Sequence, residues 1–147
     1  KIVAEDGEVR IAGVARKDHV LRAGDKVQLG PAFGFQYQRP TSRSLSSSLQ
    51  LGSGFQVAGT DRVILMKDRG RDGRILLGPG GDVHVRVPRA SGEVEVFATP
   101  SGQMRIACAQ GGTIDGVPFK GEHPVAAGQV VEAAGVSFLL LPWQSGA

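Results

Sequence analysis

The sequence has few of the residues that indicate an oxidising compartment, a membrane segment or a surface that stacks nucleic-acid bases. Its single cysteine, Cys108, cannot form a disulfide within the chain. No apolar run approaches the roughly 20 residues that cross a bilayer, and the opening residues do not have the pattern of a signal peptide. One Trp, one Tyr and six Phe are few rings for stacking nucleic-acid bases. We therefore expect a cytoplasmic protein without a membrane segment, whose partner is a protein rather than a nucleic acid.

An excess of charge of one sign is also missing. The formal net charge is +3, and basic residues alternate with acidic ones, as in residues 67–74, "KDRGRDGR". This mixture is typical of solvated turns and strand edges. A binding surface for an anionic partner is the alternative interpretation.

Glycine and short alternating apolar segments are abundant. The chain has 22 Gly and 8 Pro, and the stretches "DVHVRV" and "GEVEVF" alternate with a period of two. No segment combines a 3.6-residue period with helix caps. The pattern predicts an all-β fold with these strands: 9–11, 27–29, 33–37, 55–57, 63–66, 75–77, 83–87, 94–97, 104–108, 130–132 and 137–141.

A Ser-rich segment, residues 40–50, divides the chain into two related parts. The segment "PTSRSLSSSLQ" has the composition of a flexible linker. Before it, "RIAGV" and "RAGDKVQL" can be aligned with "TIDGV" and "AAGQVVEA" after it, and His19 then falls on His123. The alignment predicts a tandem repeat whose first copy, residues 1–39, is incomplete.

The second part, residues 51–143, resembles a forkhead-associated (FHA) domain in the order of its motifs. The stretches that carry the resemblance are "RVILMKD", "RILLGPGGDVHVRV", "EVEVFATPSGQMRIA", "TIDGVPF", "VAAGQVVEAAG" and "SFLLLPW". The resemblance implies an FHA-like antiparallel β-sandwich of the SMAD/FHA type, with loops at one end forming a phosphothreonine-peptide site. Residues 1–39 would then be the C-terminal half of a first FHA-like unit.

The residues at these loop positions argue against the family's usual ligand. Pro79 follows Gly78 where the resemblance implies an arginine, and proline offers a phosphate neither a guanidinium group nor an N–H. Ser91 can stand as the serine of the family's Ser-x-x-His element, but Val94 replaces the histidine. We expect a degenerate peptide site at Gly78, Pro79, Arg89, Ser91, Asp115 and Gly116, in which the last two replace an Asn-Gly turn.

Two other binding functions stay open. Arg69, Arg71 and Arg74 flank a predicted hairpin tip, and with Arg86 and Arg89 they could converge on an acidic or phosphorylated partner. The first hairpin, "GEVRIAGV" followed by "VLRAGDKVQL", also resembles the end of S4-type RNA-binding domains. Its nearby basic residues are Arg16, Lys17, Arg22 and Lys26.

No catalytic, cofactor or metal constellation is visible in the sequence. "GPGG" is not followed by the Gly-Lys-Ser/Thr of a phosphate-binding loop, and the three histidines are isolated from one another. We expect His84 on a solvated sheet face, His19 and His123 in a shared structural role, and Cys108 in the core. The expected function is protein–protein interaction or scaffolding, of a bacterial signalling type, within a larger multidomain protein. Exposed strand edges of the incomplete first copy favour self-association.

Overall fold

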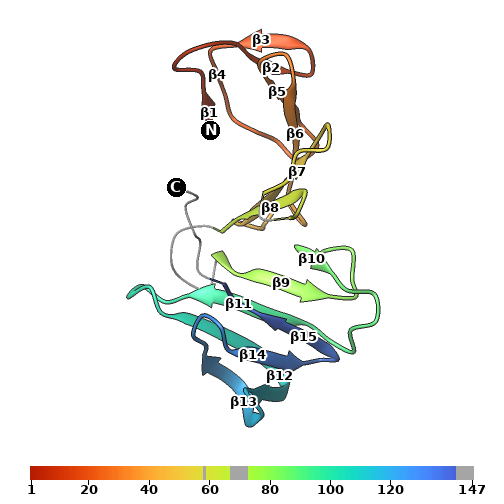
Figure 1. The fold of residues 1–147 in the computed structure, drawn as a ribbon, viewed down its shortest axis with the longest axis vertical. Helices are drawn as coiled ribbons and strands as arrows, with labels where there is room; N and C mark the ends of the chain where they lie inside the picture. The colour runs from red at the N-terminus through yellow and green to blue at the C-terminus, as the bar shows by residue number, and fades with distance from the viewer. Residues whose placement is uncertain (58, 67–72, 142–147) are drawn as a thin grey trace. The chain divides into compact units, whose positions relative to one another are not determined.

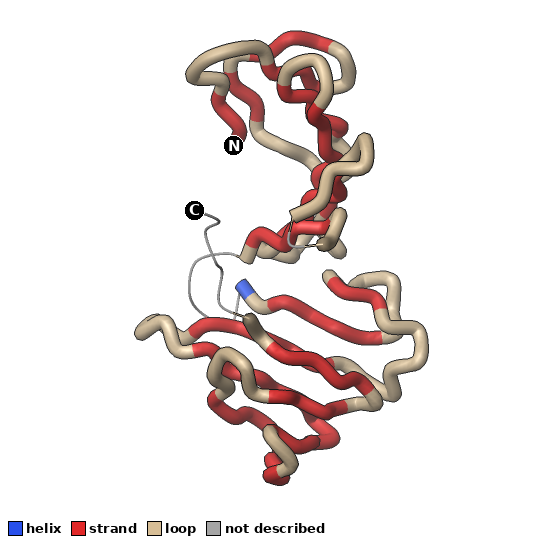
Figure 2. Tube along the Cα trace, viewed as in Figure 1, coloured by secondary structure: helices blue, strands red, loops and turns tan. Residues whose placement is uncertain are grey.

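The computed structural model describes residues 1–57, 59–66 and 73–141, and the chain divides into two compact units (Figure 1). Unit 1 is Lys1–Leu65 and unit 2 is Met66–Ala147. Strands joined by turns make up both units, and the only helical residue described is Gly73 (Figure 2). The expected all-β class is confirmed. Among the described residues, no helix has the length and apolar character needed to cross a membrane.

In unit 1, where residue 58 alone is not described, the strands form a six-stranded antiparallel sheet and a separate two-stranded ribbon. The sheet order is β3-β2-β5-β6-β7-β8, and β1 pairs with β4 separately. The strands are β1 (Ile2–Val3), β2 (Val9–Ile11), β3 (Val14–Arg16), β4 (Asp18–His19), β5 (Lys26–Leu29), β6 (Phe33–Gln38), β7 (Ser47–Leu51) and β8 (Arg62–Leu65).

The pairing register of unit 1 places apolar residues on one face of its sheet. Ile11 lies opposite Val27, Val27 opposite Phe35, and Phe35 opposite Leu51. Because directly paired residues share a face, these four side chains form one row, and all are buried. The neighbouring row on the opposite face runs through Lys26, Gln36, Gln50 and Arg62, so the alternation of the sequence separates an apolar from a polar face.

The Ser-rich segment differs from its expected form. Ser47–Leu51 is strand β7, which pairs with β6 on one side and β8 on the other, and Ser46, Ser47 and Ser48 are buried. The boundary between the compact units falls after Leu65 instead of within residues 40–50. Serine has little intrinsic preference for strands, but here the ladder hydrogen bonds of both neighbours determine the conformation.

The described residues of unit 2 form one seven-stranded sheet. The order is β10-β9-β11-β12-β14-β15, and β13 pairs with β12 off this path. The strands are β9 (Ile75–Gly78), β10 (Val85–Arg86), β11 (Val94–Ala98), β12 (Met104–Ile114), β13 (Val117–Pro124), β14 (Val130–Ala133) and β15 (Val136–Leu139). All pairs are antiparallel except β9 with β10.

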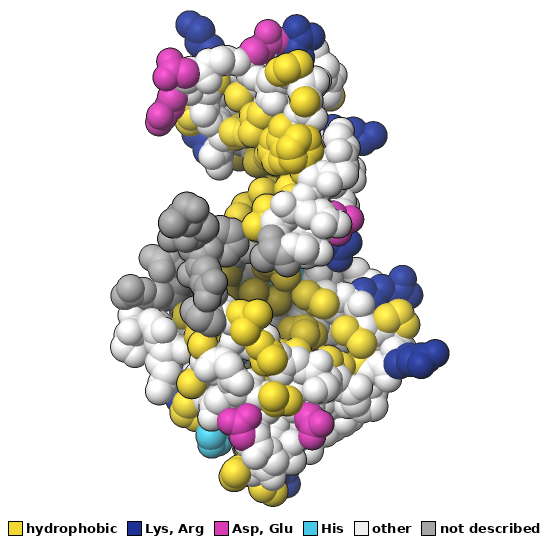
Figure 3. Space-filling model, viewed as in Figure 1, with side chains coloured by type: hydrophobic (Ala, Val, Ile, Leu, Met, Phe, Trp, Pro, Cys, Tyr) yellow, Lys and Arg dark blue, Asp and Glu magenta, His cyan; other side chains and the backbone are white. Residues whose placement is uncertain are grey.

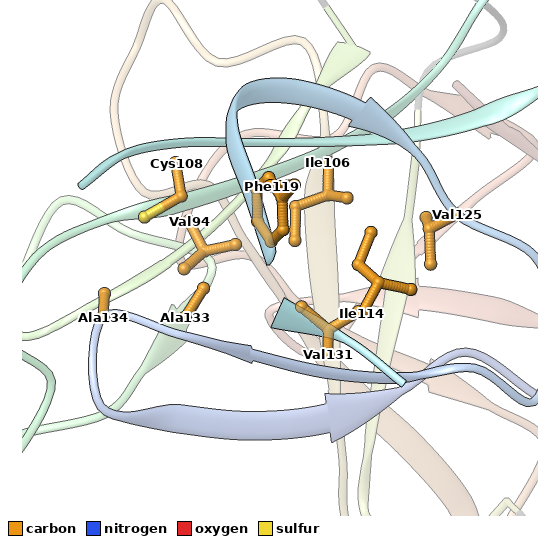
Figure 4. Packing of buried hydrophobic residues seen from close by; sticks show 9 residues of the cluster. All are labelled: Val94, Ile106, Cys108, Ile114, Phe119, Val125, Val131, Ala133 and Ala134. Atoms are coloured by element: carbon orange, nitrogen blue, oxygen red, sulfur yellow. The ribbon is translucent and has the colours of Figure 1, made fainter. Parts of the chain in front are cut away.

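A bulge in β12 lets this sheet fold over its own core. The register with β13 shifts between Cys108 and Gly112, and Gly111 has a φ of 75°. The part of β12 before the bulge pairs with β11, and the part after it pairs with β14. Figure 4 shows the side chains that meet inside, among them Val94, Ile106 and Val131, each 0% exposed. Cys108 is buried among them, as expected.

Most predicted strands are present, with three kinds of difference. Residues 55–57 contribute only an isolated bridge from Val57 to Thr60, and the strand expected over 83–87 is limited to Val85–Arg86. The prediction missed β1, β3, β4, β7 and β13. Of these, β3 and β13 are the second strands of hairpins with Ala12–Gly13 and Asp115–Gly116 turns, in which both turn residues have positive φ.

The aligned repeat has matching hydrogen bonds in the two units. In unit 1 the N–H of Ala12, in the β2–β3 turn, donates to the carbonyl of Lys26 at 3.0 Å. In unit 2 the N–H of Asp115, in the β12–β13 turn, donates to the carbonyl of Val130 at 2.8 Å. Each bond ties the hairpin turn to the first residue of the next strand of the repeat.

A second pair of equivalent hydrogen bonds closes the Ala-Gly turn of each unit, Ala23–Gly24 in unit 1 and Ala127–Gly128 in unit 2. The N–H of Gly24 donates to the carbonyl of Tyr37 at 2.8 Å, and the N–H of Gly128 donates to that of Leu140 at 2.7 Å. Strands β2, β3, β5 and β6 therefore correspond to the end of β12, β13, β14 and β15.

Candidate interaction site at the loop end of unit 2

The carboxyl end of β9 is covered by the loop of residues 87–93. The N–H of Val87 donates to the carbonyl of Gly78 at 2.7 Å. A Cβ atom on Gly78 would lie 3.0 Å from Cγ of Glu93, so glycine permits this close approach. The loop that contains Ser91 and the segment that begins at Gly78 thus belong to one end of unit 2.

Ser91 joins this loop to the β14–β15 turn and to the bulge of β12. Its N–H donates to the carbonyl of Ala134 at 2.8 Å, in the β14–β15 turn. Its hydroxyl donates to Oε1 of Gln110 at 3.3 Å, and Nε2 of Gln110 donates to the carbonyl of Ser91 at 3.2 Å. Both residues are exposed, so this paired contact lies at the surface.

Gln110 is the member of the site that sequence reasoning missed. It lies in the β12 bulge, where the sequence had predicted only a strand ending at Cys108. The Gly111–Gly112 pair was the available signal, since paired glycines inside a strand often mark a bulge. A Cβ on Gly92 would lie 3.2 Å from Nε2 of Gln110, which shows how closely the two loops approach.

Asp115 and Gly116 are not part of this group. Asp115 bonds to the first residue of β14: its N–H donates to the carbonyl of Val130 and its Oδ1 accepts from the N–H of Val130, both at 2.8 Å. Ser91 bonds beyond the other end of β14, at Ala134. The two turns therefore lie at opposite ends of β14, and Gln110–Gly111 takes the position beside Ser91 that was expected for Asp115–Gly116.

The basic residues are divided between the two ends of β9. Arg86 pairs with Gly78 at the carboxyl end, and both Arg86 and Arg89 are exposed. Figure 3 shows Lys and Arg side chains at the side of unit 2 towards which β9 points in Figure 1. Arg74 precedes β9 at its other end, with Nε 3.7 Å from Oε1 of Glu95. Arg74 and Arg89 therefore lie at opposite ends of β9 and do not converge as expected. Arg69 and Arg71 lie outside the described residues.

Acidic side chains accompany the loop arginines. A Cβ on Gly80 would lie 2.6 Å from Oδ1 of Asp82, so this carboxylate folds back over the "GPGG" segment. Pro79 is exposed beside it, and Glu93 is exposed next to Gly78. The loop end therefore carries both signs of charge, which weakens its attraction for a phosphate dianion.

The histidines make contacts of other kinds. His84, expected on a solvated face, is 5% exposed, and its Nδ1 accepts a hydrogen bond from the N–H of Leu76 at 3.0 Å. Nδ1 of His123 lies 2.7 Å from the carbonyl oxygen of its neighbour Pro124, the last residue of β13, so the contacts in the structure do not show the role expected to be shared with His19. His19 instead contacts Oδ2 of Asp25 at 2.9 Å. In the described part of the chain, no group of three metal-ligating side chains comes together.

The fold defines an all-β protein of two units that share a repeated strand arrangement. Comparison with known proteins finds no matching family model, no matching curated protein and no matching solved structure. The resemblance to the FHA family therefore stays a prediction, based on the order of motifs along the chain.

Proposed function

We propose that unit 2 is a non-catalytic protein-interaction module that binds its partner at the end formed by Gly78, Arg89, Ser91 and Gln110. The observation that carries the proposal is the reciprocal bond between Ser91 and Gln110. It connects the exposed loop of residues 87–93 with the bulge of β12, and the backbones of both are already attached to the sheet. Loops held by a rigid scaffold are the usual location of binding residues, because little conformational entropy is lost on binding.

The composition of the site supports recognition of an extended peptide. Gly135 is exposed beside Ser91, and a Cβ there would meet its nearest neighbour, the carbonyl of Arg89, only at 3.7 Å. Glycines of this kind let a partner backbone approach closely. The side-chain amide of Gln110 and the hydroxyl of Ser91 supply donors and acceptors for that backbone.

A phosphate on the partner is not required by this proposal. Pro79 supplies no N–H and no positive charge, and the Asp82 carboxylate lies against Gly80 in the same segment. A phosphothreonine would meet this carboxylate without a compensating arginine from the "GPGG" segment. The expected module therefore binds a peptide with little preference for its phosphorylated form.

Selection of a random peptide library on the immobilised full chain tests the proposal. A selected peptide should lose at least about tenfold in affinity with Gln110→Ala or Ser91→Arg, which corresponds to about 1.4 kcal/mol. The matched control is Gln28→Ala, an exposed glutamine of unit 1. A library that yields no binder, or binders that tolerate both loop substitutions, would contradict it.

An acidic partner held by arginines is the second candidate, because Arg86 and Arg89 are both exposed on the segment that follows β9. Titration of Glu-rich and phosphothreonine peptides at low and moderate salt tests it. Binding should weaken as salt rises, and the double variant Arg86→Gln/Arg89→Gln should abolish it. Equal affinity of wild type and double variant would rule out this candidate.

A further inference from the structure

The outer edge of β15 differs from the same edge of β6, its counterpart in unit 1, which pairs with β7. Strand β6 pairs with β5 on one side and with β7 on the other. Strand β15 pairs with β14, the counterpart of β5, and is the last strand of its sheet in the described part of the chain. The position that β7 occupies in unit 1 thus has no described occupant in unit 2.

Backbone groups of β15 point outward at the same positions as in β6. Tyr37 directs both its N–H and its carbonyl to the β5 side, and the carbonyl of Gly34, three residues earlier, points outward and accepts from the N–H of Gly52 at 2.9 Å. Leu140, the counterpart of Tyr37, likewise accepts from Gly128 on the β14 side. Because strand residues alternate, the N–H and C=O of Ser137 and Leu139 face away from β14.

The side chains of β15 also match those that contact β7 in unit 1. Phe35 lies opposite Val27 in unit 1, and Phe138 lies opposite Val131 in unit 2. Phe138 is only partly buried, whereas Phe35, which has Leu51 opposite it, is 8% exposed. Leu139 remains 43% exposed on the outer face.

We propose that the β15 edge is a docking site for the β7–β8 hairpin, Ser47–Leu65, of a second copy of this chain. The register follows from the repeat: Leu51 of the second copy lies opposite Phe138, Gln50 opposite Leu139, and Leu49 opposite Leu140. The apolar residues of the hairpin then cover Phe138 and extend the apolar face of the sheet. The proposal does not rest on the proposed function, because it involves a strand edge and not the loop end.

The hairpin can be exchanged because its two positions offer nearly the same contacts. On β6 it pairs with Phe35 and Tyr37; on β15 it pairs with Phe138 and Leu140. Moving the hairpin from β6 of one copy to β15 of another replaces one strand ladder by a similar one and leaves β6 with an open edge, so the association depends on protein concentration. We therefore expect a dimer whose fraction rises with concentration.

A disulfide cross-link between two different chains tests the register. One full chain carries Gln50→Cys and the other Leu139→Cys, and both carry Cys108→Ala to remove the native thiol. Antiparallel partners have Cα atoms about 4.5 to 5.5 Å apart, which suits a disulfide. Mild oxidation of the mixture should give a covalent heterodimer. The matched control replaces Leu139→Cys with Glu132→Cys, an exposed position of β14, and should give none.

Two further variants separate exchange from other kinds of association. Gln36→Cys/Gln50→Cys, a pair already opposite in unit 1, should lock the hairpin to its own β6 when oxidised and keep the chain monomeric. Leu139→Pro removes an N–H that faces away from β14, and should abolish the dimer; Leu139→Ala should retain it. Sedimentation velocity measures both.

Several results would overturn the proposal. One is a chain carrying both Gln50→Cys and Leu139→Cys that cross-links only within itself, since the hairpin then occupies β15 of its own chain. A dimer that persists in the oxidised, locked variant would show association through another surface. Absence of the heterodimer cross-link, with the locked variant forming its disulfide normally, would show that β15 does not accept the hairpin.

Discussion

Asp25 and Gln129 occupy the same position in the two copies of the repeat. Oδ2 of Asp25 accepts a hydrogen bond from the N–H of Arg22 at 2.8 Å, and Oε1 of Gln129 accepts one from the N–H of Ala126 at 2.7 Å. Each side chain closes the Ala-Gly turn that precedes a strand. The carboxylate and the amide fulfil the same structural role, but only the carboxylate titrates.

This difference predicts acid sensitivity in unit 1. The N–H of Arg22, and next the side chain of His19, hold the pKa of Asp25 below its ordinary value of 3.8. A carboxyl whose pKa is lower in the folded chain stabilises folding above its unfolded pKa, and this contribution disappears as the pH falls through the folded pKa. Asp25→Asn should therefore flatten the decline of unfolding free energy below about pH 4. Asp61→Asn is the control, and an unchanged acid profile in Asp25→Asn would contradict the prediction.

Gly112 should be intolerant of a side chain. A Cβ at this position would lie 2.2 Å from the carbonyl oxygen of Glu132 and 2.9 Å from Cβ of Ala133. Gly112→Ala must therefore separate β12 from β14, and we expect a loss of more than about 2 kcal/mol in unfolding free energy. Gly81→Ala, where a Cβ meets nothing within 4 Å, should change it by less than about 0.5 kcal/mol. Urea denaturation measures both, and similar losses would argue against this packing.

His84 should contribute to stability through its ring nitrogen. Because Nδ1 of the buried His84 accepts the N–H of Leu76, His84→Leu leaves that partly buried donor without this acceptor. The expected loss is about 1 to 3 kcal/mol. His84→Asn, whose side-chain oxygen can accept the same bond, should lose less. If Asn and Leu destabilise equally, the hydrogen bond is not the cause.

Pro79→Arg tests whether the loop end retains a latent preference for phosphate. The substitution restores an N–H and adds a guanidinium beside Gly78, so a library-selected peptide should gain about tenfold in affinity when its threonine is phosphorylated. Pro79→Gln restores the N–H without the charge and is the matched control. Isothermal titration with the phosphorylated and the unphosphorylated peptide measures the ratio of their affinities. If Pro79→Arg does not raise this ratio, the phosphate does not bind beside Gly78.

Part of the candidate site could be predicted from the sequence, and part could not. Gly78 and Ser91 were expected at one loop end, and the structure brings their segments together. The sequence could not show that Gln110, and not Asp115, lies beside Ser91, because the bulge of β12 that contains Gln110 depends on pairing with β13. Likewise, His84 alternates with valines and was expected in solvent, but the loop before β10 turns its ring towards Leu76.

The sequence by itself determined the all-β class and the repeat, because alternation and turn-forming glycines act over a few neighbouring residues. Only the tertiary structure decided that Ser47–Leu51 is a strand, since its conformation depends on the ladders of β6 and β8 on either side. Only the tertiary structure likewise decided that Asp115 and Ser91 lie apart. Asp115 bonds to Val130 at the start of β14, and Ser91 bonds to Ala134 just after its end. Local preferences determine which segments are extended, and long-range backbone pairing determines which loops meet.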